Sequence, residues 1–321
     1  MNKIYQALFF LILLSCSSDN GAKNILTDNG DGDNGDGDIV NLGGSVQELV
    51  VELITTYDSQ TASFSAPHGN FVRNFIVHVP PNYDSKIQSL PLVFVLHGYT
   101  SLAPLIRQYS GFDQISDTEN FLVVYVQGTT DIYGNTGWNA GRFGAFTMVD
   151  DVGFFRSLIN YFKSNYNIDE GKIFSTGMSM GGFMSYRLAC EVDGINSIGS
   201  VTGSMGGYIA CEPLTRKSII HFHGTADTIV PYGGGDWLYS ANEAHEFWSN
   251  YNKCRNQAYT TLPDFNGDGQ YTKKLTSYNC EDNKKVELYS LEGEGHTWYS
   301  QNFGHDVSSS ELIWQFFKNQ E

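Results

Sequence analysis

The sequence predicts an α/β protein with a mostly parallel, doubly wound sheet that is flanked by helices in a single domain. Several short apolar runs have the length of strands buried on both faces of a sheet, which is typical of parallel strands. Segments with helical periodicity alternate with these runs, and this alternation predicts a sheet with crossover helices. The chain has 321 residues, 41% of them hydrophobic, which is enough for one large domain of this kind.

The N-terminal half of the domain predicts an antiparallel start followed by buried strands. Its expected strands, which are apolar runs or alternating and β-rich segments, are 46–57, 71–79, 92–96 and 121–126. A helix is expected over 150–166, because its apolar residues recur at helical spacing. Asp150 or Asp151 can cap its first turn.

The C-terminal half continues the alternation of strands and helices. A short strand from Lys172 runs into glycines, and a helix over 182–191 follows. Further strands are expected over 195–203, 218–224 and 284–291, and further helices over 238–251 and 308–320. The chain shows no internal repeat.

The N-terminus has the features of a targeting segment rather than of the fold. Residues 1–15 combine Lys3 with an apolar run that is too short to span a bilayer, which predicts a signal peptide. The run ends in Leu-Leu-Ser before Cys16 and resembles a bacterial lipobox, so Cys16 is the expected site of lipidation. An ordinary signal peptide is the alternative. Residues 16–44 predict a flexible Gly/Asp-rich tether, and residues 45–321 the folded domain.

The charge balance limits the possible partners. The formal net charge is −16, which argues against nucleic acid and against anionic membrane surfaces. We therefore expect membrane contact only through the N-terminal lipid anchor. The predicted location is that of an outer-membrane lipoprotein, facing either the periplasm or the cell exterior.

Four cysteines remain in the mature domain. They are Cys190, Cys211, Cys254 and Cys280. An even number of cysteines in an exported chain predicts two disulfides, for which three pairings are possible. We favour the sequential pairing because both loops are then short. Zinc binding is the alternative, but no Cys-x-x-Cys or close Cys/His spacing supports it, and no metal site is predicted.

The stretch STGMSMGGF contains Gly177-x-Ser179-x-Gly181 between a predicted strand and a predicted helix. A Gly-x-Ser-x-Gly sequence alone is a weak signal, since turns favour both residue types. In a strand–turn–helix context it predicts a nucleophile elbow, in which the serine hydroxyl is lifted clear of the sheet. Ser179 is therefore the expected nucleophile of an α/β-hydrolase.

A serine nucleophile needs a base, and the elbow predicts an acid and then a histidine later in the chain. Asp227 follows the strand 218–224, and His296 follows the strand 284–291 in a glycine-rich loop. His296 is the expected general base and Asp227 the acid that orients it. The competing histidines are expected to have other roles. His245 and His305 are predicted to lie at the surface, and His221 and His223 to pack or bond loops.

The oxyanion hole requires two N–H donors. Met180, the residue after the nucleophile, is expected to supply the first donor. The second is expected from the loop His97-Gly98-Tyr99-Thr100, which follows the strand 92–96. We favour Tyr99, with Thr100 as the alternative. No cofactor is expected for this chemistry.

The segment Asp264–Gly269 (DFNGDG) matches the opening of an EF-hand loop. Position twelve of that loop would be Leu275, where calcium loops need a bidentate glutamate. We therefore expect a polar surface loop. The acidic run over 28–38 is similarly expected to be a solvated spacer rather than a loose calcium site.

The domain resembles a known group of enzymes over residues 70–320. The stretches that carry the resemblance are LPLVFVLHGYT, GWNAGRFG, VDDVGFFRSLI, STGMSMGGFMSYRLACE, HFHGTADTIVPYGGG and GEGHTWY. They are similar to the polyhydroxybutyrate depolymerase-like and feruloyl esterase-like serine esterases, which include carbohydrate esterase family one. The resemblance implies an α/β-hydrolase fold, with the nucleophile at Ser179, the acid at Asp227 and the base at His296. The spacings of the four cysteines also resemble those of members with two such bridges.

The resemblance also suggests residues that contact the substrate. Trp138 and Asn139 lie in a stretch that resembles a substrate-side loop, and Trp298 follows the catalytic histidine. An indole ring in such a loop can stack on an aromatic acyl group or a sugar, although packing is the alternative for Trp138. Met180 stands where the family often has alanine, which is expected to narrow the pocket.

These features predict an exported serine esterase that forms an acyl-enzyme. The expected substrate is a feruloylated or acetylated polysaccharide or oligosaccharide, and feruloyl (cinnamoyl) esters of plant cell-wall xylan fit best. The alternatives are a polyhydroxyalkanoate depolymerase and an acetyl xylan esterase. A lipoprotein that only binds carbohydrate is a more remote alternative, because a binder has no need of serine, histidine and aspartate together.

Overall fold

The fold is described from a computed structural model that covers residues 48–141, 146, 148–207 and 210–320. The predicted signal peptide, the predicted lipidation site Cys16 and the tether 16–44 lie outside these residues. Within the part of the chain that is described, no helix is long and apolar enough to cross a membrane.

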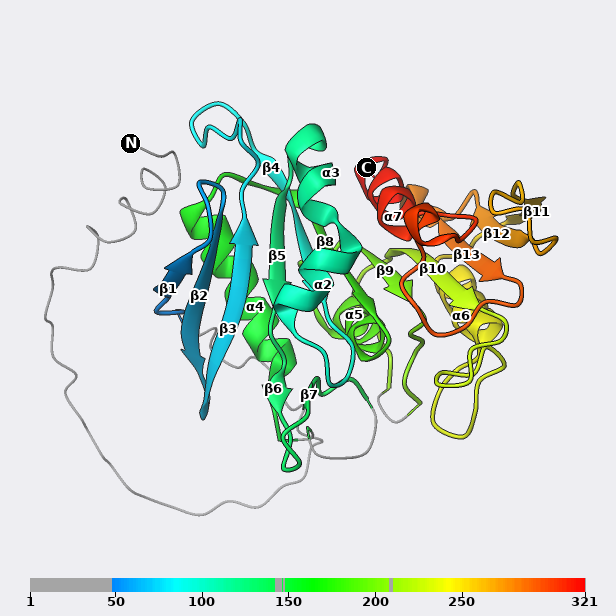
Figure 1. Ribbon diagram of the computed structural model, residues 1–321, viewed down its shortest axis with the longest axis horizontal. Helices are drawn as coiled ribbons and strands as arrows, with labels where there is room; N and C mark the ends of the chain where they lie inside the picture. The colour runs from blue at the N-terminus through cyan, green and yellow to red at the C-terminus, as the bar shows by residue number, and fades with distance from the viewer. Residues whose placement is uncertain (1–47, 142–145, 147, 208–209, 321) are drawn as a thin grey trace, which may run out of the picture.

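One 11-stranded sheet runs through the domain in the order β1-β2-β3-β5-β4-β8-β9-β10-β13-β12-β11 (Figure 1). The strands are β1 (Glu52–Thr56), β2 (Thr61–His68), β3 (Phe71–His78), β4 (Leu90–Leu96), β5 (Leu122–Val126), β8 (Ile168–Met178), β9 (Ser197–Val201), β10 (Ser218–Gly224), β11 (Asn256–Thr261), β12 (Thr272–Tyr278) and β13 (Val286–Leu291). The central strands β5, β4, β8, β9, β10 and β13 are parallel. The strands at both edges are antiparallel.

Helices cover both faces of this sheet (Figure 1). They are α2 (Ala103–Ser110), α3 (Phe112–Glu119), α4 (Asp151–Asn165), α5 (Met180–Glu191), α6 (Ala241–Tyr251) and α7 (Ser309–Lys318). Buried side chains of α4, α5 and α6 form one apolar cluster with the sheet. Those of α2, α3 and α7 form a second cluster on the opposite face. The predicted doubly wound α/β architecture is therefore confirmed.

The predicted elements are recovered best where the apolar signal is strong. All side chains of β5 and β9 are buried, as expected for strands inside a parallel sheet. Asp150 caps α4 by accepting a hydrogen bond from the Gly153 N–H at 2.8 Å. Helix α6 begins at Ala241 rather than at Leu238, because Ser240 and Glu243 form a reciprocal capping box there.

Three strands of the main sheet, β2, β11 and β12, were not expected from the sequence, and neither was a second small sheet. β2 contains several small residues, and every residue of the edge strand β11 is exposed. β12 is paired between β11 and β13. A short second sheet, β6 (Thr129–Thr130) with β7 (Thr136–Gly137), forms a hairpin beside the carboxyl end of β5. Polar or small side chains leave these elements without the periodicity on which the prediction depends.

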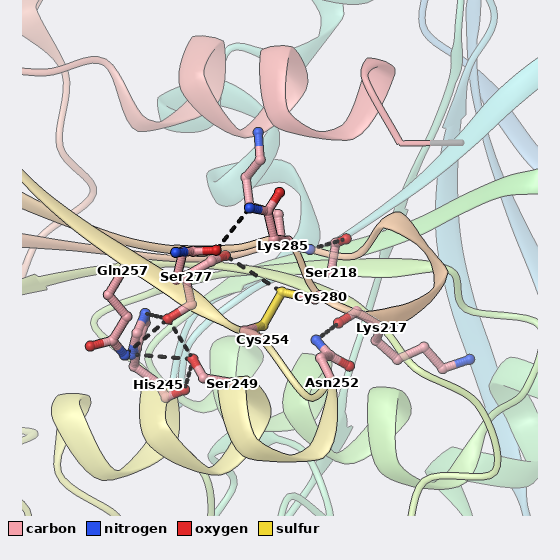
Figure 2. The surroundings of a disulfide bond; sticks show 12 residues. Lys217, Ser218, His245, Ser249, Asn252, Cys254, Gln257, Ser277, Cys280 and Lys285 are labelled. Atoms are coloured by element: carbon pink, nitrogen blue, oxygen red, sulfur yellow. Dashed lines mark hydrogen bonds between the residues drawn. A yellow bond between two sulfur atoms is a disulfide. The ribbon is translucent and has the colours of Figure 1, made fainter.

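The four cysteines form the sequential disulfides Cys190–Cys211 and Cys254–Cys280, as predicted. Figure 2 shows the second disulfide, which joins the chain just after α6 to the chain just after β12. Next to it, the Asn252 side chain donates a hydrogen bond to the Lys217 carbonyl at 2.7 Å. The disulfide therefore closes the open end of the β11–β12 hairpin, next to the end of α6.

Candidate active site

Three polar side chains follow strands of the parallel centre at the same edge of the sheet. Ser179 follows β8, Asp227 lies just after β10, and His296 lies in the loop after β13. The carboxyl ends of parallel strands are where open α/β sheets build their sites. Hydrogen bonds also link the two loops, since the Ala226 N–H donates to the Glu294 carbonyl at 3.0 Å.

Ser179 has the strained backbone of a nucleophile elbow. Its φ is 52° and its ψ is −121°, a conformation that residues with a Cβ rarely adopt. The Ser179 N–H donates to the Val201 carbonyl at 2.8 Å, which ties the turn to β9. A Cβ on Gly181 would lie 2.2 Å from the Leu96 carbonyl oxygen, and one on Gly177 would lie 2.5 Å from the Gly181 carbonyl carbon. Both positions of the Gly-x-Ser-x-Gly motif therefore exclude any side chain.

His296 and Asp227 form an acid–base pair. The His296 Nδ1 atom lies 2.7 Å from Asp227 Oδ2. Because a carboxylate only accepts, Nδ1 carries the proton and Nε2 is left as the basic atom. The Asp227 side chain has no exposed surface, whereas that of His296 is 15% exposed.

The surroundings of Asp227 keep it ionised. Burial opposes its ionisation, but hydrogen bonds from His223, His296 and the Val230 N–H outweigh burial and hold the pKa of the carboxyl well below its usual range. The N–H groups of Ile229 and Val230 each donate to Oδ1 at 2.9 Å. Asp227 therefore presents a fixed negative charge to His296.

The competing histidines have settings that differ from that of His296. His305 Nδ1 lies 2.7 Å from Glu294 Oε1. His245 is buried, with only 3% of its surface exposed, so the prediction that it lies at the surface is wrong. Its Nε2 atom lies 3.4 Å from Ser277 Oγ. Burial lowers the pKa of His245 to about 4. His221 and His223 are buried in β10.

The loop expected to complete the oxyanion hole lies against the nucleophile. A Cβ built on Gly98 would be 3.3 Å from the Ser179 Cβ. The Thr100 N–H donates to the Thr136 carbonyl at 2.9 Å, which removes the alternative donor. Met180 is the first residue of α5, where a helical N–H has no carbonyl partner within its own helix. Tyr99 and Met180 remain our predicted donors.

His97 has a structural role in this loop. The Gly128 N–H donates to His97 Nε2 at 2.9 Å, so the proton is on Nδ1, which donates to the Gly98 carbonyl at 2.7 Å. Burial lowers the pKa of His97 to about 4 and keeps the ring neutral. The imidazole thus links the oxyanion loop to the end of β5.

Two of the residues expected to contact substrate are buried instead. Trp138 is fully buried, and its Nε1–H donates to the His97 carbonyl at 2.8 Å. Trp298 is 4% exposed, and its Nε1–H donates to Ser310 Oγ at 2.9 Å. The prediction that these rings stack on a substrate is therefore wrong, because both indoles are used in packing. The Asn139 amide donates to the Val149 carbonyl at 2.9 Å, and its predicted substrate contact stays a prediction.

Tyr99, Phe146 and Met180 form a different group of side chains, in which Met180 directly follows the nucleophile. The Met180 Sδ and the Phe146 ring both approach Gly137, where a Cβ would lie 2.8 Å from each. The rings of Phe146 and Tyr99 meet edge to face at 6.3 Å. The Tyr99 hydroxyl donates to Asp131 Oδ2 at 2.8 Å, and Asp131 also accepts backbone bonds within the β6–β7 hairpin. The sequence carried no periodic signal for this group, which is assembled by loops.

The EF-hand-like segment forms a loop that its own backbone closes. The Asp264 carboxylate accepts from the N–H of Gly267 at 2.6 Å and of Gly269 at 2.9 Å. Among the residues that the structure describes, no group of three or more His, Cys, Asp or Glu side chains is placed to hold a metal.

Fold and site together define an α/β-hydrolase, and comparison with known proteins identifies its class. No family model matches the chain. The chain is 28% identical over 257 residues to the "Probable feruloyl esterase C" of Aspergillus flavus, a match that covers 76% of this chain and 83% of that protein. It is 25% identical over 273 residues to poly(3-hydroxyalkanoate) depolymerase C of Paucimonas lemoignei, covering 74% and 61%.

A solved structure supports the fold independently. The acetyl xylan esterase of Aspergillus awamori superposes with a TM-score of 0.55 at 15% identity, over 84% of this chain and 99% of that chain. The resemblance inferred from the motifs is thus confirmed. The protein is a carboxylic ester hydrolase with the α/β-hydrolase fold, similar to the feruloyl esterases.

Proposed function

We propose that the protein is an exported serine esterase that cleaves feruloyl (cinnamoyl) esters of plant cell-wall xylan with Ser179, His296 and Asp227. The observation that carries the mechanism is the 2.7 Å contact between His296 Nδ1 and Asp227 Oδ2, at the same sheet edge as the strained Ser179. This contact leaves Nε2 as the basic atom, which is the atom that a serine nucleophile requires.

The proposed reaction has two steps. His296 Nε2 takes the proton of the Ser179 hydroxyl while Oγ attacks the ester carbonyl, and the N–H groups of Tyr99 and Met180 stabilise the oxyanion. His296 then protonates the departing alcohol and leaves an acyl-enzyme. Water, deprotonated by the same Nε2, attacks the acyl carbonyl, and His296 returns that proton to Ser179 Oγ as the acid is released. Asp227 stays ionised throughout and stabilises the imidazolium.

The choice of a feruloyl substrate has two supports. One is the similarity to a protein named feruloyl esterase over most of both chains. The other is the pair Tyr99, which is 43% exposed, and Met180, which is partly exposed and directly follows the nucleophile; an aromatic ring and a thioether suit a planar aromatic acyl chain. A polyhydroxyalkanoate depolymerase is the second candidate, because one relative carries that name.

The substrate is tested by comparing kcat/KM for methyl ferulate, soluble hydroxybutyrate oligomers and acetylated xylan. Ser179→Ala serves as the blank. Preference for ferulate by tenfold or more, about 1.4 kcal/mol of transition-state binding, supports the proposal. Preference for hydroxybutyrate or for acetyl groups contradicts the feruloyl assignment and leaves the serine esterase mechanism in place.

Export and anchoring form a separate part of the proposal. The apolar N-terminal run, Cys16 after it and the two disulfides of the domain support an exported lipoprotein of the outer membrane. Incorporation of labelled palmitate into the wild-type chain and its loss in Cys16→Ser are the expected results. A wild-type chain without label contradicts the lipid anchor.

A further inference from the structure

A chain of buried polar side chains leads from α5 to the catalytic acid. The Tyr186 hydroxyl lies 3.1 Å from His221 Nδ1, and His221 Nε2 lies 3.1 Å from His223 Nδ1. His223 Nε2 lies 2.8 Å from the Val230 carbonyl oxygen and 3.5 Å from Asp227 Oδ2. At most 1% of the surface of each of the three donor side chains is exposed. None of the three takes part in the proposed reaction.

The acceptors at the end of this chain fix its protons. Both neighbours of His223 Nε2, a carbonyl oxygen and a carboxylate oxygen, can only accept, so Nε2 carries a proton. In a neutral His223 ring, Nδ1 then accepts from His221 Nε2–H, and His221 Nδ1 accepts from the Tyr186 hydroxyl. Burial lowers the pKa of His221 well below its usual range and raises that of Tyr186, in keeping with neutral groups. Every donor in the chain thus points towards Asp227.

The position of His223 affects the orientation of the Asp227 carboxylate. Asp227 and Val230 lie on the same turn, which we call the acid turn. Each supplies an acceptor near His223 Nε2–H: the Val230 carbonyl oxygen and the Asp227 Oδ2 atom. The Oδ1 atom is held by two backbone N–H groups of that turn. The Oδ2 atom must face His296 Nδ1, and a rotation of the carboxylate would break this contact.

We propose that His223 is a positioning residue for the catalytic acid, acting through its Nε2–H, and that Tyr186 and His221 hold it in the required tautomer. The inference rests on the proposed function, in which Asp227 orients His296. His223 itself is too deeply buried to touch substrate. Its contacts with Val230 and Asp227 hold the acid turn in place, so that Asp227 Oδ2 stays directed at His296 throughout turnover.

Two polar substitutions separate this role from packing. The amide of Gln reaches the place of Nε2 and keeps a donor for Val230 and Asp227, whereas the amide of Asn reaches only the place of Nδ1. We expect His223→Gln to keep kcat within about threefold, and His223→Asn to lose up to about 100-fold in kcat, the cost of a misplacement of ~1 Å. KM is expected to change little in both. His245→Asn, which replaces another buried histidine that does not contact Asp227, should keep kcat.

Equal kcat values for His223→Gln and His223→Asn would overturn the positioning role. The wild-type protein provides a measurement that does not depend on the folding of variants. The ¹⁵N shifts of His223 should show a protonated Nε2, and an unprotonated Nε2 would overturn the proposal. The Ser179→Ala variant distinguishes failure of the proposed function from failure of the proposed role of His223. Activity in Ser179→Ala refutes the proposed function, whereas an inactive Ser179→Ala beside a fully active His223→Asn refutes only the role of His223.

Discussion

The Nδ1 atom of His296 lies 2.7 Å from Oδ2 of Asp227, an oxygen that belongs to a side chain with no exposed surface. A buried carboxylate is costly unless its hydrogen bonds are satisfied, and Asp227 is satisfied by two backbone N–H groups and two imidazoles. This arrangement determines which nitrogen of His296 is basic, and the first prediction follows from it.

Asp227→Asn should lower kcat by about 10⁴-fold, the size of effect that an incorrect histidine tautomer produces. The amide can donate to His296 Nδ1, which then moves the ring proton to Nε2 and removes the base. Stopped assays of the purified variant, with circular dichroism to confirm the fold, measure the effect. A variant with kcat within tenfold of the wild type would contradict the assigned role of Asp227.

The elbow makes a steric prediction. In Gly181→Ala the added Cβ would lie 2.2 Å from the Leu96 carbonyl oxygen, so backbone must move. We expect a loss of about 1–3 kcal/mol or more in the free energy of unfolding, as for overpacked sites, together with loss of activity. Gly233→Ala is the matched control, because nothing lies within 4 Å of a Cβ there. Equal unfolding midpoints for the two variants in urea would contradict the account.

The disulfide Cys254–Cys280 should contribute stability without affecting catalysis. It joins positions 26 residues apart in the sequence, for which chain entropy predicts about 3.5 kcal/mol. The double variant Cys254→Ser, Cys280→Ser should lose stability of that order in urea and keep its kcat at 25 °C. Loss of kcat in a variant that remains folded would show that the β11–β12 hairpin supports the site.

Lys217 predicts a pH dependence of stability. Burial is the main reason that its pKa falls to about 8, although Asp193 opposes the shift. The unfolded value is about 10.4, so between about pH 8 and 10.4 the unfolded chain binds more protons at this position. The contribution of Lys217 to the free energy of unfolding therefore rises with pH in that window. Urea unfolding from about pH 7.5 to 9.5 should show this rise in the wild type relative to Lys217→Met. Parallel pH profiles would contradict the shift.

The sequence was most informative where one local signal decides the structure. The run Leu92–Leu96 is fully buried in β4, because a continuous apolar strand inside a parallel sheet is covered on both faces. Ser179, Asp227 and His296 were predicted because each lies in the segment that follows a strand, in the expected chain order. That the three residues come together is a property of the tertiary structure, and it follows from the neighbouring parallel strands β8, β9, β10 and β13.

The remaining features depend on contacts that no local pattern carries. Trp138 was placed at the substrate because its motif lies near the site, but its indole N–H is taken by the His97 carbonyl. His223 was expected to pack or to bond a loop, and its partners are His221 on the same strand and the Val230 carbonyl of the turn that carries Asp227. Tyr99 and Phe146 meet through loops of unrelated sequence. Such groupings arise from loop geometry, which periodicity does not encode.

The most direct test of the central claim is labelling with a fluorophosphonate, followed by mass spectrometry of the modified peptide. The serine esterase mechanism predicts one adduct on Ser179, none in Ser179→Ala, and much slower labelling in His296→Ala, because His296 Nε2 must take the hydroxyl proton. Labelling at another residue, or a wild-type protein that hydrolyses esters but gives no adduct at Ser179, would contradict the serine esterase mechanism.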